Sequence, residues 1–157
     1  MKLYVLSDTH GRIEKAVAIY KKLHSIDLII HLGDLVSDSM KISELTGSPM
    51  ISVKGNNDFF HKKEDFRILE TEYGNLFLTH GHIQGVKFGL QKLLYRTLEL
   101  NCKAVLFGHT HIPLFTESNG VYLLNPGSLT LPMDSSSGSY AIVNTSADEF
   151  SASICSP

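Results

Sequence analysis

The first third of the chain alternates between short apolar runs and amphipathic segments, and this alternation constrains the fold more than any other feature. Residues 1–6, 28–32 and 50–53 are apolar runs that are too short for helices, as expected of buried strands. Helical spacing of apolar residues follows the first run at 12–23, and a shorter helical segment follows the second at 36–45. A strand, a crossover helix and a second strand build parallel sheets, so we expect an α/β fold that begins this way.

The rest of the chain adds strands of another kind. We expect a hairpin over 67–79 with its turn at 73–75, then a helix over 88–100 and a buried strand at 104–107. Turn-rich connections separate four further short strands, at 114–117, 121–124, 140–144 and 151–154. These features predict two facing mixed β-sheets flanked by helices, a four-layer α/β/β/α sandwich. No linker or repeat interrupts the sequence, so we expect one domain over 1–157.

Composition narrows the class of protein without identifying its activity. A net charge of −2 provides no overall positive field that would hold nucleic acid, and no apolar run is long enough to span a membrane. Cys102 and Cys155 lie in unrelated contexts and are expected to be reduced. We therefore expect a cytoplasmic protein with no membrane partner and no strong nucleic-acid signal, which could associate into a homo-oligomer.

Polar side chains with potential chemistry follow five of the expected strands. Ligands of open α/β sheets bind beyond the carboxyl ends of the strands, and residues two apart on a strand share a side. Five of the eight histidines fall at these ends, close to glycine. The five ends carry Asp8 and His10, Asp34, Asn56 and Asn57, His80 and His82, and His109 and His111. Each could be an ordinary turn or cap, but their repetition predicts a metal site where the five strand ends converge on one edge.

The candidate ligands are carboxylates, imidazoles and amides, with no thiolate among them. This set suits Mn, Fe, Zn or Ni rather than a structural zinc cage, which would favour cysteine. There are more candidate ligands than one ion needs, and two ions that share a bridging carboxylate would account for the surplus. Sites with two metal ions lower the pKa of bound water and assist in-line phosphoryl displacement.

The order of these motifs resembles that of the calcineurin-like metallophosphoesterases, and especially the small bacterial and archaeal phosphodiesterases. The resemblance covers nearly the whole chain and rests on Asp8-x-His10, Gly33-Asp34, Gly55-Asn56-x-Asp58, His80-Gly81 and Gly108-His109-x-His111. It implies an enzyme that hydrolyses a small phosphodiester with a metal-bridging hydroxide as nucleophile. It also implies two divalent ions, with Mn²⁺ expected and Ni²⁺, Fe or Zn²⁺ as alternatives. One ion would take Asp8, His10 and His111, the other Asn56, His80 and His109, and Asp34 would bridge them.

Two positions depart from the family pattern. Many members carry histidine after the motif asparagine, but this chain has Asn57, which can donate a hydrogen bond and cannot act as an acid. We infer a preference for good leaving groups or a substitute acid, for which His82 is the best-placed residue, with Asp58 as an orienting group. In the loop after Ser128, where relatives often carry a basic residue, this chain has Met133, which predicts that a phosphate-contacting cation is missing.

Other readings of the sequence stay open. The retromer subunit of vacuolar sorting resembles this fold with a degraded metal site, so a non-catalytic metal-binding scaffold is one alternative, and a metal-dependent nuclease is another. We expect His31 to be buried and hydrogen-bonded rather than a ligand, and His24 and His61 to lie at the surface. Phe59 and Phe60 could form a substrate wall, contact another copy of the chain or anchor their loop to the core.

Overall fold

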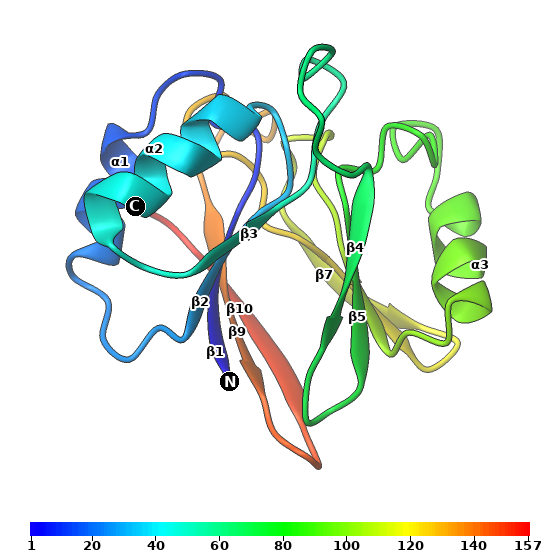
Figure 1. Cartoon of the computed structure of the whole chain (residues 1–157). Helices are drawn as coiled ribbons and strands as arrows, with labels where there is room; N and C mark the ends of the chain where they lie inside the picture. Colours follow the sequence, from blue (N-terminus) through cyan, green and yellow to red (C-terminus); the bar gives the residue numbers. More distant parts are fainter.

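A computed structural model describes all 157 residues, and it contains two five-stranded mixed sheets that face each other (Figure 1). In the first sheet, β1, β2 and β3 are parallel and β9 and β10 are antiparallel to their neighbours. The order across this sheet is β10 (Phe150–Cys155), β9 (Tyr140–Thr145), β1 (Lys2–Leu6), β2 (Leu28–His31) and β3 (Met50–Ser52).

The second sheet has a parallel centre and antiparallel edges. Strands β5, β6 and β8 are parallel, and the two outer strands run against them. The order is β4 (Phe66–Glu70), β5 (Asn75–Thr79), β6 (Ala104–Leu106), β8 (Val121–Asn125) and β7 (Leu114–Ser118). Helices α1 (Glu14–Tyr20) and α2 (Val36–Thr46) cover the outer face of the first sheet, and α3 (Gln91–Glu99) covers that of the second. The predicted four-layer sandwich is confirmed.

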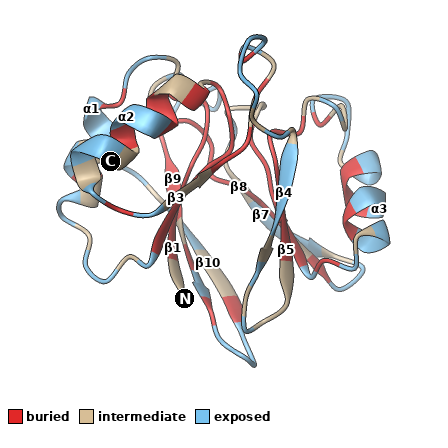
Figure 2. Cartoon of the chain, in the orientation of Figure 1, coloured by how far each residue is buried: buried red, intermediate tan, exposed pale blue.

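Alternation along the strands produces three apolar layers. In β1, Leu3 and Val5 point between the two sheets, whereas Tyr4 and Leu6 point toward α1. In the second sheet, Phe77 turns toward α3 in the same way. The central strands are therefore buried on both faces (Figure 2), which explains why their sequences are continuous apolar runs.

Two of the three helices are shorter than their sequence patterns indicate, whereas α2 spans the segment expected over 36–45 and one residue more. The segment expected over 12–23 is helical only at Glu14–Tyr20, and the segment expected over 88–100 begins at Gln91. In the second case Gly89 adopts φ +140°, and the side chain of Phe88 is almost fully exposed, so it does not extend the apolar face of α3. No helix combines the length and the apolar character that crossing a membrane would require.

Candidate metal centre

The candidate ligands lie on loops that meet at one end of the sandwich, between the two sheets. Strands β1, β2 and β3 deliver three of the loops from the first sheet, and β5 and β6 deliver two from the second. The expectation that all five strand ends share one edge is therefore wrong. After β3 the chain leaves the first sheet and enters the second through β4, so the ends converge from two sheets.

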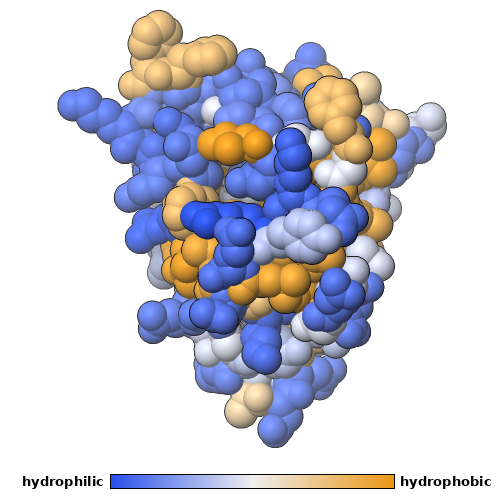
Figure 3. Space-filling model, turned by 90° about the vertical axis from the view of Figure 1, so that its right-hand side faces the viewer, coloured by the Kyte–Doolittle hydropathy of each residue, from blue (hydrophilic) through white to orange (hydrophobic).

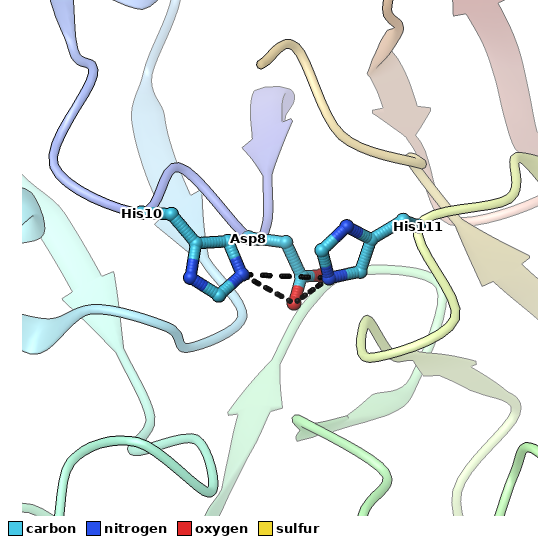
Figure 4. Close-up of side chains that lie close together, drawn as sticks. All are labelled: Asp8, His10 and His111. Atoms are coloured by element: carbon cyan, nitrogen blue, oxygen red, sulfur yellow. Dashed lines mark hydrogen bonds and ion pairs between the residues drawn. The ribbon is translucent and has the colours of Figure 1, made fainter. Parts of the chain in front are cut away.

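One group of side chains surrounds a single carboxylate oxygen of Asp8. His111 Nε2 lies 3.2 Å from Asp8 Oδ1, and His10 Nε2 lies 4.0 Å from the same oxygen. The two Nε2 atoms are 3.4 Å apart, so both rings direct a nitrogen to one point (Figure 4). These three residues could hold a metal ion.

A second group is centred on His80. Its Nε2 lies 3.2 Å from Asn56 Oδ1 and 3.2 Å from His109 Nδ1. The same atom lies 3.8 Å from Asp8 Oδ1 and 3.7 Å from Asp34 Oδ2. Asp8, Asp34 and His80 together form another group that could hold an ion. The structure thus brings all seven predicted ligands together, with the two carboxylates between the two sets of histidines.

Backbone carbonyls fix the orientation of two of the imidazoles. His80 Nδ1 donates to the carbonyl of Leu32 and His111 Nδ1 to that of Leu131, each at 2.7 Å. Because a carbonyl can only accept, the uncharged form of each ring carries its proton on Nδ1 and its lone pair on Nε2. Both lone pairs point into the cluster, as metal coordination requires.

Asp8 provides the test of whether the residues suit a cation. Its Oδ2 accepts hydrogen bonds from Ser7 Oγ at 2.5 Å and from the His109 backbone N–H at 2.9 Å, whereas Oδ1 is buried without a hydrogen-bond partner. An unpaired buried carboxylate oxygen is costly, and a cation held by the surrounding nitrogens would satisfy it. Burial raises the Asp8 pKa, but the close approach of His111 and the charge of His80 outweigh that effect, so the pKa lies below its usual value. The carboxylate is therefore the form available to a cation.

Five of the seven candidate ligands adopt a backbone conformation that L-residues rarely take. The φ values are positive at Asp8 (56°), His10 (45°), Asp34 (51°), His109 (69°) and His111 (58°). Left-handed conformations at non-glycine residues cost about 1–3 kcal/mol each and persist where the surrounding structure enforces them. Such residues cluster at functional sites, and here they turn the side chains inward immediately after rigid strands.

Two of the histidines have displaced pKa values. Burial and the charges of His80 and Lys87 lower the pKa of His109 to about 4. Asp8 raises the pKa of His111. At neutral pH His109 is therefore uncharged, and its Nδ1 faces the cluster, 3.2 Å from His80 Nε2.

The two residues after Asn56 hold the ligand loops in place. Asn57 donates to Asp34 twice, from its backbone N–H to Oδ1 at 3.0 Å and from Nδ2 to Oδ2 at 2.6 Å. Asp58 is buried and accepts backbone N–H groups of Asp34, Val36 and Gly55. Its carboxylate thus ties the loop after β2 to the loop after β3.

His82 lies beside the second group without belonging to it. Its ring centroid is 5.4 Å from that of His80, and its Nδ1 is buried without a hydrogen-bond partner. Burial, together with the charge of His80, lowers the His82 pKa. The ring borders a cavity of about 300 Å³ that Lys54, Asn56 and Phe59 also line. His82 can therefore reach a molecule that enters the site from this side.

A buried chain of hydrogen bonds supports the loop between Asp8 and His10. His31 is fully buried, as expected, and its Nδ1 accepts the N–H of Gly33, so its Nε2 donates to Thr9 Oγ1 at 3.0 Å. Thr9 Oγ1 then donates to Asp38 Oδ2 at 2.6 Å. The roles of Thr9 and Asp38 were not predicted, because nothing in their local sequence distinguishes them from an ordinary turn and helix residue.

The aromatic pair after Asp58 does not anchor its loop. The side chain of Phe59 is 82% exposed and that of Phe60 is 100% exposed, so the core-anchor interpretation is wrong. His24 and His61 are exposed, as expected.

Comparison with known proteins supports the chemistry that this geometry indicates. Residues 1–148 match the profile of the calcineurin-like phosphoesterase superfamily domain. The chain is 34% identical to the probable metallophosphoesterase YsnB of Bacillus subtilis, over 94% of this chain and 86% of that protein. It is also 32% identical to a phosphodiesterase of Methanocaldococcus jannaschii, over 81% of this chain and 83% of that protein.

The fold also matches solved structures. The Zn²⁺ complex of Vps29 from Entamoeba histolytica superposes with a TM-score of 0.81, over 98% of this chain and 91% of that one. The two sequences are 22% identical, so this likeness concerns the fold alone.

Proposed function

This chain belongs to the calcineurin-like phosphoesterase superfamily, and from that premise we propose that it is a two-metal phosphodiesterase. The single observation that carries the proposal is the buried, unpartnered Oδ1 of Asp8, which faces the Nε2 atoms of His10, His80 and His111. These residues come from distant parts of the sequence and converge on one oxygen. All seven predicted ligand positions carry an oxygen or nitrogen donor, which favours an enzyme over a scaffold with a degraded site.

The residues present fit two divalent ions. We assign Asp8, His10 and His111 to one ion, and Asn56, His80 and His109 to the other. Asp34 is the proposed bridge, because its Oδ2 lies 4.0 Å from His10 Nε2 and 3.7 Å from His80 Nε2. When bound, the ions would lower the pKa of water and neutralise charge on the phosphoryl oxygens.

The protein's own residues would position and protonate the reacting groups. Asn57 holds the Asp34 carboxylate through two hydrogen bonds and so fixes the proposed bridge. Hydrolysis adds water across one P–O ester bond and releases an alcohol whose oxygen needs a proton. His82, whose ring borders the cavity at the edge of the site, is the proposed donor.

The test compares a diester with its monoester. We expect Mn²⁺-reconstituted protein to hydrolyse bis(4-nitrophenyl) phosphate faster than 4-nitrophenyl phosphate, and metal-free protein to hydrolyse neither. His111→Ala should lose most of the activity, whereas His61→Ala, a matched change at an exposed histidine, should keep it. If neither ester is hydrolysed in a metal-dependent way, the enzyme proposal fails and a metal-binding scaffold becomes the better explanation. Faster hydrolysis of the monoester would make the protein a phosphomonoesterase.

A further inference from the structure

An apolar groove of about 570 Å³ lies beside the candidate metal centre, within the size range of small-molecule sites. Its buried lining includes Val86 and Phe107, which belong to the apolar layer under α3. Ile112 and Met133 also line it with side chains that are 46% and 70% exposed. Apolar side chains likewise interrupt the hydrophilic surface of the face that carries α3 (Figure 3).

The walls of the groove are continuous with the loops that carry the candidate ligands. The backbone N–H of Met133 donates to the carbonyl of His111 at 3.2 Å, and that of Val86 donates to the carbonyl of Gly81 at 3.3 Å. Thr110 lines the groove and stands between His109 and His111 in the chain. A molecule bound at the metal centre could therefore extend into the groove.

Lys87 and Thr110 are the two polar residues of the lining. Thr110 Oγ1 is already engaged, because it accepts from Asn125 Nδ2 at 3.0 Å and from the N–H of Ile112 at 3.2 Å. The Lys87 side chain is exposed and lines the same groove as Thr110, which stands between the candidate ligands His109 and His111. Lys87 thus places a cation next to the candidate metal centre. It lies on a different loop from Met133, the position at which relatives often carry a basic residue.

We propose that the groove binds the apolar ester group of a phosphodiester, and that Lys87 contacts the phosphoryl group beside it. The inference rests on the proposed function and specifies its substrate class. An aliphatic or aromatic group suits the lining, whereas a sugar or a nucleobase would find few free donors or acceptors there. The charge of Lys87 complements the phosphodiester anion.

The first experiment varies the ester group that stays on phosphorus. Methyl, butyl and hexyl 4-nitrophenyl phosphates share one leaving group, so differences in kcat/KM report binding of the alkyl chain. We expect kcat/KM to rise about 10-fold or more from methyl to hexyl. Met133→Gln should reduce this ratio about threefold or more, and Met40→Gln, the same change at an exposed methionine on α2, should leave it unchanged. A flat series, or equal effects of the two variants, would overturn the proposal.

The second experiment tests the cation. Lys87→Gln should lower kcat/KM about 10-fold for every diester alike, because each carries the same anionic phosphoryl group. Lys87→Arg should restore most of the loss, and Lys92→Gln, at an exposed lysine on α3, should have no effect. If Lys87→Gln acts no more strongly than Lys92→Gln, Lys87 does not contact the phosphoryl group.

Binding measurements separate failure of the groove from failure of the enzyme proposal. Calorimetry on Mn²⁺-loaded protein should show hexylphosphonate binding about 10-fold more tightly than methylphosphonate, with the advantage lost in Met133→Gln. This result without any hydrolysis would keep the groove and refute the phosphodiesterase proposal. Equal affinities would refute the groove alone. Light scattering completes the test by measuring the oligomeric state. If the wild-type protein is a dimer and Met133→Gln is a monomer, the groove is an interface between copies and the proposal is overturned.

Discussion

His31 predicts a specific loss of stability in mild acid. The ring is fully buried, and burial lowers its pKa from the ordinary value of 6.5 to about 4. The folded protein therefore excludes a proton that the unfolded chain accepts below about pH 6.5. Stability should fall as the pH drops from about 6.5 to about 4, and this contribution should level off at lower pH, where both states carry the proton.

The size of the effect follows from the two pKa values. A group that is protonated only in the unfolded chain lowers the free energy of unfolding by about 1.36 kcal/mol for each pH unit of acidification. Because the histidine is only partly protonated near pH 6.5, the free energy of unfolding falls by about 2 kcal/mol between about pH 7 and pH 5. Other groups near the centre also titrate in this range, so the His31 contribution must be isolated by comparing variants. His31→Gln keeps a donor for Thr9 Oγ1 and removes the titrating ring.

The assay is urea unfolding of metal-free protein at the two pH values. Wild type should lose about 2 kcal/mol more on acidification than His31→Gln. His24→Gln, at an exposed histidine, should behave like wild type. If His31→Gln loses as much stability as wild type between the two pH values, the folded state does not exclude a proton from His31 and the reasoning is wrong.

Three further predictions concern the site. Asp34→Asn should weaken binding of both ions at least about 10-fold, which metal analysis after dialysis would measure. If the variant retains two ions at full occupancy, Asp34 is not the bridge. His82→Ala should steepen the dependence of kcat on leaving-group pKa across a series of aryl diesters, and an unchanged slope would exclude His82 as the acid. Gly108→Ala should destabilise the fold by about 1–3 kcal/mol in thermal or urea unfolding, because a Cβ would overlap Ser7 Oγ. The double variant Gly108→Ala/Ser7→Ala should recover part of the lost stability. If it recovers none, the added Cβ does not clash with Ser7 Oγ.

The layers and the ligand set could be predicted because both depend on local pattern. A strand buried on both faces must be apolar along its length, so its end is visible as the first polar residue, as at Ser7 after Leu6. Counting such ends found the candidate ligands. The same pattern could not say which sheet a strand joins, because pairing depends on contacts distant in sequence, such as that of β1 with β9. The assumption of a single edge failed for this reason.

Features that depend on tertiary contacts had no signal in the sequence. Positive φ at residues such as His109 and His111 opposes their local preference, so the conformation can only be imposed by the folded surroundings. Nothing in the sequence distinguishes Lys87 from a solvated lysine, and its place beside the candidate metal centre depends on a loop that β5 and α3 position. A substituted family position such as Met133 therefore does not establish that a charge is absent from the site. Because a phosphoryl group responds to charge in space rather than in sequence, a cation can be supplied from a different loop, as we propose for Lys87.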